Sequence, residues 1–396
     1  MKLIERDYLK QLESVKSTPD IKVITGVRRS GKSKLLEAFI QNVSADTHNN
    51  IIHINFMNEA YESLLEAHSL YQYVKEHTDE SKNNIVCIDE VQLCENFEKA
   101  VSWLHAEEKY DIYITGSNAF LLSSDLATIF TGRTFEIEIF PFSFAEFMRY
   151  YELEDCYSAF DRYIDEGGMA GSYLYSDIEQ KRDYISKVYR TLIVRDIKTK
   201  FGIKNSPLLA SLTEFLMDNI GCETSVRKIA SALTQAKMKT NDKTVGSYIE
   251  YLCNAFLFYR VRRYDVQGKR YLASTDKYYL SDHSFRYAEL GTKNMNYGRT
   301  LENIVAVELL RRGYEVYVGV LYQKEIDFVA VKRSEKLYIQ VSDDISSPET
   351  FKRECSPLLS IKDAYPKYIL ARTRHDSTDY EGIHICDISR WLCGSE

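Results

Sequence analysis

The chain has 396 residues, which at roughly 100–200 residues per domain predicts two to four domains. Its 44% hydrophobic and 28% charged residues are typical of a folded protein and exclude disorder as the main state. A net charge of -7 excludes a uniformly cationic nucleic-acid-binding protein but allows a local basic face. With no run of about 20 apolar residues and no signal-peptide segment, we expect a cytoplasmic protein without a membrane partner.

The first part of the chain alternates between strand and helix patterns. Because such alternation is typical of a parallel sheet covered on both faces, we predict an α/β fold. The predicted strands are 21–25, 51–56, 85–88, 111–115 and 135–140, and the predicted helices are 4–16, 34–42, 58–78 and 95–108.

After Pro141 the pattern changes to helices, which continue to about residue 204. Apolar spacing then predicts three helices, a two-stranded ribbon, and a last block of one long helix with strands and a mixed tail. These elements are the helices 208–220, 225–236, 242–255 and 299–312, and the strands 257–264, 270–280, 314–319, 325–331 and 336–342.

A phosphate-binding motif lies between the first predicted strand and the second predicted helix. The residues fit GxxxxGK[ST] at every position, a Walker A motif in the context it requires. Glycines let backbone N–H groups turn inward around phosphate, and the helix N-terminus adds its positive dipole end. We expect Lys32 to reach the β- and γ-phosphates of ATP and Ser33 to ligate Mg²⁺. The candidate cofactor-binding residues are Gly26, Val27, Arg28, Arg29, Ser30, Gly31, Lys32, Ser33 and Lys34.

Two acidic residues follow the apolar run Ile85–Ile88, as a Walker B motif requires. Asp89 is predicted to hold Mg²⁺, and Glu90 is placed to activate the attacking water. The alternative is an ordinary strand end, which is less favoured beside a complete phosphate loop.

Polar residues also follow the fourth predicted strand. If that strand is a neighbour of the Asp89 strand, its end lies between the phosphate loop and Asp89. Ser117 or Asn118 could then sense the γ-phosphate or position water, although a simple turn explains the pair equally well. Arg133 precedes the fifth strand and is a candidate for stabilising transition-state charge in a neighbouring protomer's site; the alternative is an exposed loop arginine. Whether the protein forms a homo-oligomer stays open.

Several segments resemble one family, the AAA-type P-loop ATPases of archaea and bacteria that carry a C-terminal domain of unknown function numbered 4143. The similar segments are VITGVRRSGKSKLL, IDEVQ, ITGSNAFLLSSDLATIFTGR, IFPFSFAEF, YIDEGGMAG and GRTLENIVAVELLRRGYEVYVG. The resemblance covers essentially the whole chain. It implies an AAA+ core at 1–145, a helical lid at 146–205, a winged-helix domain at 206–292 and a nuclease-like C-terminal domain at 293–396.

The segment from Ser225 to Ala273 is strongly basic, with ten Lys or Arg opposed by Asp242, Glu250 and Asp265. Three helices and a ribbon in such a segment are typical of a winged helix that binds duplex DNA. The alternative is a basic face that packs on the acidic ATPase core. The ten residues are Arg227, Lys228, Lys237, Lys239, Lys243, Arg260, Arg262, Arg263, Lys269 and Arg270.

The last block resembles the PD-(D/E)xK nuclease fold, with acids Glu302 and Asp327 as a tentative second metal site and Gln340 on the next strand. Ser342 stands where that pattern has lysine, which removes a charge that stabilises the transition state. Compensation could come from Lys324, Lys332 or Lys336. We favour a catalytically inactive fold kept for DNA or protein binding.

Together these patterns predict an AAA+ ATPase that hydrolyses ATP with Mg²⁺ and couples the hydrolysis to binding of double-stranded DNA. Its catalytic candidates are Glu90, Lys32, Asn118 and Arg133. One alternative is an ATP-gated, metal-dependent nuclease. Another is an ATPase switch that controls a partner protein without DNA.

Overall fold

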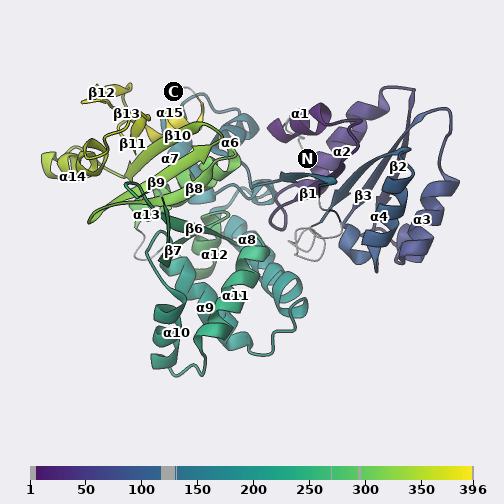
Figure 1. Ribbon diagram of the computed structural model, residues 1–396, viewed down its shortest axis with the longest axis horizontal. Coiled ribbons are helices and arrows are strands. Elements are labelled where there is room, and N and C mark those ends of the chain that lie inside the picture. Colours follow the sequence, from purple (N-terminus) through teal and green to yellow (C-terminus); the bar gives the residue numbers. More distant parts are fainter. Residues whose placement is uncertain (1–5, 117–129, 131, 269, 293–295, 395–396) are drawn as a thin grey trace. The chain divides into compact units, whose positions relative to one another are not determined.

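A computed structural model describes residues 6–116, 130, 132–268, 270–292 and 296–394 (Figure 1). The chain divides into two compact units. The first unit is Met1–Pro141 with Asn254–Phe256, and the second is Phe142–Cys253 with Leu257–Glu396. The division after Pro141 lies near the domain boundary predicted at residue 145. The boundaries predicted at residues 205 and 292 fall inside the second unit and stay predictions.

The first unit is built on a five-stranded sheet in the order β2-β3-β4-β1-β5, and every neighbouring pair is parallel. This confirms the predicted parallel α/β fold. Its elements are α1 (Asp7–Ser14), β1 (Ile21–Thr25), α2 (Lys32–Ser44), β2 (Asn49–Asn55), η1 (Glu59–Leu64), α3 (Ala67–Glu76), β3 (Asn83–Asp89), η2 (Val91–Leu93), α4 (Phe97–Ala106), β4 (Tyr110–Thr115) and β5 (Thr134–Glu138).

Helices pack on both faces of this sheet. Val86 and Ile88 of β3 join a core cluster with apolar residues of α3 and α4. Tyr113 of β4 contacts Phe39 of α2 instead, with 4.4 Å between ring centroids. Because both faces are covered, β3 is buried on both sides, which explains its continuous apolar run.

The prediction of one helix over residues 58–78 is wrong. A short 3-10 helix, η1, is followed by a separate α-helix, α3. Between them Glu66 adopts an extended conformation and pairs with Glu95, whose backbone N–H donates to Leu65 O at 2.7 Å. This tertiary hydrogen bond takes a carbonyl that a continuous helix would use, so the helix begins again at Ala67.

The second unit begins with helices and contains three further helices at the places predicted from apolar spacing. No helix among the described residues is long and apolar enough to span a membrane. The helical elements are α6 (Phe144–Tyr151), α7 (Cys156–Glu166), η4 (Ala170–Leu174), α8 (Ile178–Thr191), the π-helix η5 (Leu192–Thr199), α9 (Ser206–Asp218), α10 (Val226–Gln235), α11 (Asp242–Asn254) and α12 (Ser284–Leu290).

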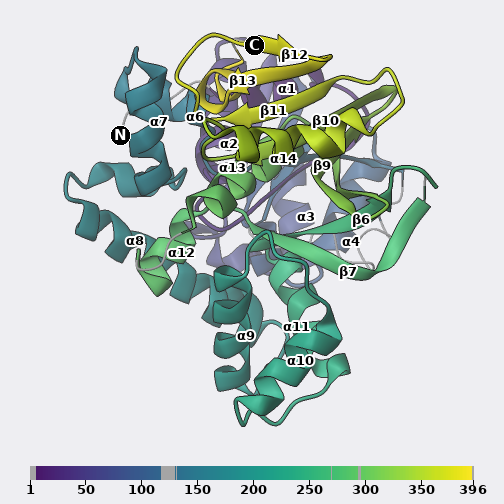
Figure 2. The same cartoon turned by 90° about the vertical axis from the view of Figure 1, so that its left-hand side faces the viewer.

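An eight-stranded mixed sheet forms the rest of the second unit, in the order β12-β13-β11-β10-β9-β8-β6-β7. In Figures 1 and 2, α9, α10 and α11 gather at one end of this unit, away from β11 to β13. The elements are β6 (Phe258–Asp265), β7 (Arg270–Leu280), α13 (Tyr297–Arg311), β8 (Glu315–Leu321), β9 (Lys324–Lys332), β10 (Glu335–Ser342), α14 (Pro348–Leu359), β11 (Lys367–Ala371), β12 (Thr378–Tyr380), β13 (Ile383–Asp387) and α15 (Ile388–Leu392).

The ribbon predicted as the wing of a winged helix is present as β6 and β7, but it is not a free hairpin. β6 pairs in parallel with β8, with Arg262 opposite Tyr317 and Asp265 opposite Val320. The ribbon therefore extends the C-terminal sheet, and the strands predicted for two separate domains share one set of hydrogen bonds. A winged-helix assignment for α9 to β7 stays a prediction.

A glycine pair after α7 holds the first residue of the second unit. Gly168 N donates to Asp282 Oδ2 at 2.6 Å, and Phe142 N donates to Gly168 O at 2.8 Å. A Cβ on Gly168 would overlap the carbonyl oxygen of Phe142. Tyr163 Oη also donates to that carbonyl, at 2.9 Å. The double glycine is thus required because two backbone segments meet where no side chain fits.

We expect Gly168→Ala to destabilise the protein by about 3 kcal/mol, because the added methyl must displace backbone rather than a flexible side chain. Urea denaturation measures this loss. Gly246→Ala is the matched control: its nearest neighbour is Val226 Cγ1 at 3.7 Å, and a helical alanine should stabilise by about 0.5–1 kcal/mol. Equal urea midpoints for Gly168→Ala and wild type would contradict the close packing at Phe142.

Candidate functional site

The loop between β1 and α2 requires glycine at two positions. Gly26 has φ 133°, and a Cβ there would overlap the carbonyl oxygen of Ile139. Gly31 has φ 104° and immediately precedes α2. Arg29 also adopts a positive φ of 66°, which is uncommon for a residue with a side chain. The loop therefore curls around the N-terminus of α2, where backbone N–H groups and the helix dipole favour an anion.

Lys32 folds back across this loop. Its ammonium donates to Gly26 O at 2.8 Å and to Val27 O at 2.9 Å, and the side chain is buried. Nearby, the buried hydroxyl oxygens of Thr25 and Ser30 have no hydrogen-bond partner among the described residues. Since buried polar atoms in native proteins are normally satisfied, these hydroxyls fit a site that takes a polar ligand.

Asp89, at the end of β3, receives two hydroxyl groups on one oxygen. Ser33 Oγ donates to Asp89 Oδ1 at 3.1 Å, and Thr115 Oγ1 donates to the same atom through a short hydrogen bond. Thr115 also accepts from Glu90 N at 3.1 Å. A carboxylate and a serine hydroxyl at the edge of a phosphate loop are oxygen ligands that suit Mg²⁺, so Ser33 and Asp89 fit the predicted metal.

The position between the phosphate loop and Asp89 was expected to carry a polar residue from the fourth strand. β4 does lie between β3 and β1 in the sheet. The residue found there is Thr115, the last of β4, whereas Ser117 and Asn118 lie outside the described residues. Thr115 was missed because a threonine ending a β-branched strand gives no local signal that its hydroxyl faces an acid.

Glu90 begins the turn after β3. It adopts a left-handed conformation with φ 56°, and its side chain is half-buried and accepts a hydrogen bond from Gln92 Nε2. Its backbone is tied to Thr115 as described above. Glu90 thus directly follows Asp89 at the same end of β3.

Arg6 is a second residue that sequence reasoning missed. Its guanidinium donates from Nη1 to Ser30 O and from Nη2 to Phe140 O, each at 2.8 Å. The side chain is buried and lies over the ring of Tyr8 at 4.9 Å. No motif marks an arginine so far from the loop in sequence, and only the folded chain reveals that it supports the loop backbone.

The other charged candidates lie farther from the enclosed part of the loop. Arg28 is half-buried and Arg29 exposed. Lys34 is exposed and pairs with Glu37 at 2.5 Å. Arg133 is exposed and precedes Thr134, which pairs with Ile21, the first residue of β1. The phosphate loop follows the other end of β1, so Arg133 does not reach the loop of its own chain, and a role across an interface stays a prediction.

The predicted second metal site is built differently. The ammonium of Lys277, on β7, lies 2.8 Å from Glu302 Oε1 and 2.8 Å from Glu325 Oε1. Tyr279 Oη donates to that same Glu302 oxygen at 2.5 Å. Asp327 Oδ2 accepts from Val341 N at 2.8 Å. Among the described residues, no group of three His, Cys, Asp or Glu could hold a metal ion.

None of the three lysines proposed to compensate for Ser342 contacts these acids. Lys324 donates to Ser356 and Ser360, Lys332 donates to Arg312 O, and Lys336 lies over tyrosine rings. Lys277 escaped notice because its strand was assigned to another domain. Only the pairing of β6 with β8 brings it to this sheet.

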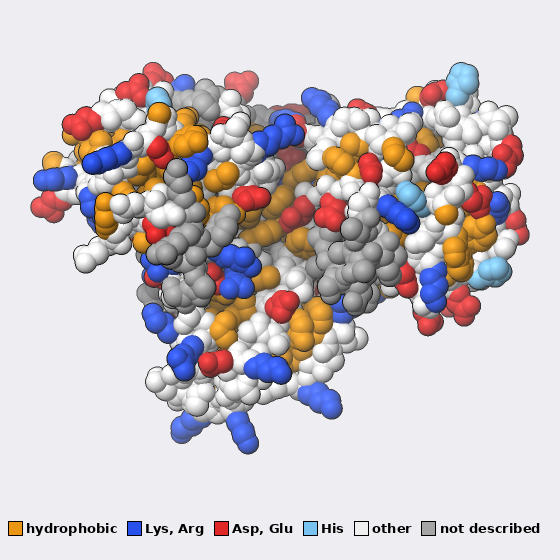
Figure 3. All heavy atoms as spheres, viewed as in Figure 1, with side chains coloured by type: hydrophobic (Ala, Val, Ile, Leu, Met, Phe, Trp, Pro, Cys, Tyr) orange, Lys and Arg blue, Asp and Glu red, His pale blue; other side chains and the backbone are white. Residues whose placement is uncertain are grey.

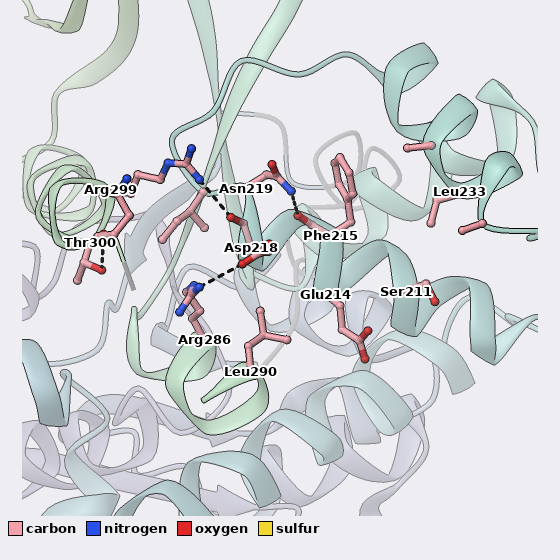
Figure 4. A pocket seen from close by; sticks show the side chains of 14 residues that line it. Ser211, Glu214, Phe215, Asp218, Asn219, Leu233, Arg286, Leu290, Arg299 and Thr300 are labelled. Carbon is pink, nitrogen blue, oxygen red and sulfur yellow. Dashed lines mark hydrogen bonds and ion pairs between the residues drawn. The ribbon is translucent and has the colours of Figure 1, made fainter. Parts of the chain in front are cut away.

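A separate cavity of about 670 Å³ lies among α9, α10, α12 and α13 (Figure 4). Its two arginines both turn to one residue: Arg286 Nη2 lies 3.1 Å from Asp218 Oδ1, and Arg299 Nη1 donates to Asp218 O at 3.4 Å. These contacts direct the cationic groups toward Asp218 rather than the open space.

Comparison with known proteins agrees with the geometry of the first unit. Residues 18–148 match the family model described as AAA domain, and residues 157–296 match a domain of unknown function, DUF8612. The predicted C-terminal domain numbered 4143 stays a prediction. An uncharacterized protein of Haemophilus influenzae is 39% identical, with 98% of each chain covered. An uncharacterized protein of Methanocaldococcus jannaschii is 29% identical, covering 87% of this chain and 78% of the relative.

Two solved structures are distantly similar. AMPPCP-bound DnaA from Aquifex aeolicus has 16% identity and a TM-score of 0.31, over 62% of this chain and 86% of that one. The Aeropyrum pernix ORC1 protein in complex with DNA has 12% identity and a TM-score of 0.33, over 72% and 93%. Likenesses this weak support no conclusion. The match to the AAA domain and the relative of nearly full length support a family assignment. The chain belongs to the same family as the Haemophilus influenzae protein, a family of AAA-type P-loop ATPases.

Proposed function

We propose that this protein is an AAA+ ATPase that hydrolyses ATP with Mg²⁺ and couples the hydrolysis to binding of double-stranded DNA. The observation that carries the ATPase part is the junction of loop and strand end: Lys32 crosses the loop, and Ser33 and Thr115 converge on Asp89. Each group the reaction needs lies at the carboxyl edge of one parallel sheet, where ligands of such folds bind.

In this proposal Lys32 exchanges the carbonyls of Gly26 and Val27 for phosphate oxygens. Ser33 and Asp89 would hold Mg²⁺, which would neutralise charge on the phosphates. Glu90 would orient and deprotonate the attacking water. Thr115 would act as a positioning residue, since its hydroxyl connects the carboxylate of Asp89 to the backbone of Glu90.

Two substitutions separate binding from hydrolysis. Lys32→Ala should weaken ATP binding by roughly 10- to 100-fold, because it removes charge-assisted hydrogen bonds. Glu90→Gln should keep ATP binding but lower kcat by about 10²- to 10⁴-fold, the usual contribution of a general base. Binding of a fluorescent ATP analogue and phosphate release measure the two effects.

Lys99→Ala is the control, because Lys99 is an exposed lysine on α4 of the same unit and belongs to none of the candidate sites. Its binding and hydrolysis should match those of wild type. Unchanged ATP affinity in Lys32→Ala would remove the loop as the nucleotide site, and wild-type hydrolysis in Glu90→Gln would show that another group activates water.

Thr115→Val keeps the shape of the side chain and removes its hydroxyl. Because a hydrogen bond to a charged group contributes about 1.5–3 kcal/mol, kcat should fall roughly 10- to 100-fold while the KM for ATP changes little. Thr115→Ser should restore most of the rate. A loss that appears in KM alone, or that serine does not rescue, would argue against a role in positioning Glu90.

The DNA part of the proposal depends on which basic residues remain accessible. Arg260 pairs with Asp276 at 2.6 Å and Arg263 with Glu223 at 2.9 Å, so these two charges are partly balanced. Lys and Arg side chains gather over α10 and α11 in Figure 3. The exposed set there, which we call the basic end, is Arg227, Lys228, Lys237, Lys239 and Lys243.

The triple variant Lys237→Glu, Lys239→Glu, Lys243→Glu tests the basic end. If each lysine contacts a phosphate, the slope of log K against log salt for duplex DNA should fall by about three. The control changes three exposed lysines elsewhere, Lys82, Lys352 and Lys362, to Glu, with the same change in net charge. Equal DNA binding by both variants would show that the basic end is not the DNA contact, and no DNA binding by wild type at low salt would favour an ATPase that acts without DNA.

A further inference from the structure

A lysine side chain, Lys277, lies among the acidic residues of the C-terminal sheet. We use the name acidic centre for Glu302 on α13 and for Glu325 and Asp327 on β9. The ammonium of Lys277 bridges Glu302 and Glu325 at 2.8 Å each, and only 3% of the lysine is exposed. Because an unpaired buried ammonium is strongly unfavourable, this geometry requires both carboxylates to be present as counter-ions.

The surrounding groups strengthen this arrangement. Tyr279, two residues along β7, donates to the Glu302 oxygen that Lys277 binds. Burial alone would lower the pKa of Lys277, but the nearby carboxylates of Glu302, Asp327 and Glu325 outweigh burial and raise it. The lysine therefore stays protonated at neutral pH. Burial and the charge of Glu302 raise the pKa of Asp327 above its ordinary value.

Gln340 and Ser342, which occupy the remaining positions of the nuclease-like pattern, form hydrogen bonds with other partners. Gln340 Oε1 accepts from Asp327 N at 2.7 Å, and Gln340 Nε2 donates to Glu354 Oε2 at 3.0 Å. Ser342 Oγ donates to Asp344 O at 3.2 Å. One oxygen of each of the three carboxylates, and both polar atoms of Gln340, are thus used in hydrogen bonds or ion pairs, so the residues present do not fit the metal that the nuclease-like pattern implies.

We propose that Lys277 is the resident cation of the acidic centre, that its ammonium takes the place of a divalent metal, and that the centre joins β7 to α13 and β9 instead of cleaving phosphodiesters. The ammonium neutralises the carboxylates as a metal would, but it offers no open coordination position for water. The low exposure of Lys277 also separates it from a catalytic lysine, which must touch its substrate. This inference does not depend on the proposed ATPase activity.

Metal binding to a lysine-free centre tests the inference. All variants carry Ser33→Ala and Asp89→Asn, so that the loop site contributes no metal, and Mn²⁺ is the probe, followed by electron paramagnetic resonance without nucleotide. The parent should bind no Mn²⁺ at the acidic centre. Lys277→Met should lower Tm by roughly 5–10 °C through its unpaired carboxylates, and it should gain one Mn²⁺ that raises Tm again.

Three further variants make each outcome decisive. Adding Glu302→Gln to Lys277→Met should abolish the gained Mn²⁺. Lys336→Met, which removes a lysine that lies over tyrosine rings in the same sheet, should gain none. Should Lys277→Met fail to fold, Lys277→Met with Glu325→Gln removes both partners of one ion pair and should still gain Mn²⁺ through Glu302 and Asp327.

Two results would overturn the inference. In the first, the parent itself binds Mn²⁺ and Glu302→Gln removes that binding. Lys277 and a metal would then coexist, and a nuclease would be the better explanation of the acidic centre. In the second, the folded lysine-free variants gain no Mn²⁺, which would mean that the ammonium does not occupy a metal's position.

Discussion

The phosphate loop depends on two backbone carbonyls that lie more than a hundred residues away in sequence. Gly26 packs against the carbonyl of Ile139, and Ile139 N donates to Thr25 O at 2.8 Å. Arg6 joins Ser30 O to Phe140 O. Both ends of the loop are thus held by the same short segment. Because Lys32 bonds to carbonyls of this loop, a ligand that draws the ammonium away must act on a backbone that Ile139 and Phe140 already constrain.

The same segment runs through Pro141 into Phe142, where the second unit begins. There Phe142 N donates to Gly168 O, and Phe142 O accepts from the hydroxyl of Tyr163. Two family-like segments, IFPFSFAEF and YIDEGGMAG, therefore have a common physical reason. The first segment contains Phe142, and the second contains Gly168, whose lack of a side chain lets its backbone approach that of Phe142. Ile139 and Phe140 make their contacts within the first unit, and Phe142 makes its contacts within the second.

Sequence reasoning located the positions that a local pattern marks. The end of a buried apolar strand placed Asp89, and the glycines around Lys32 placed the loop, because both signals lie within a few residues. It failed where a contact depends on the pairing of distant strands. Arg6 has no motif, and Thr115 looks like any β-branched strand residue. Lys277 could be found only after β6 pairs with β8, a register that composition and periodicity do not specify.

The two acidic sites of the chain differ in the charge of their nearest donors. Asp89 accepts from the neutral hydroxyls of Ser33 and Thr115, which satisfy one oxygen without cancelling the negative charge. Glu302 accepts from an ammonium, which balances its charge, and from a neutral phenol on the same oxygen. A divalent cation binds best to carboxylate oxygens that keep their negative charge. Carboxylates therefore meet neutral donors in the first unit, which fits the proposed Mg²⁺, and an internal ammonium in the second.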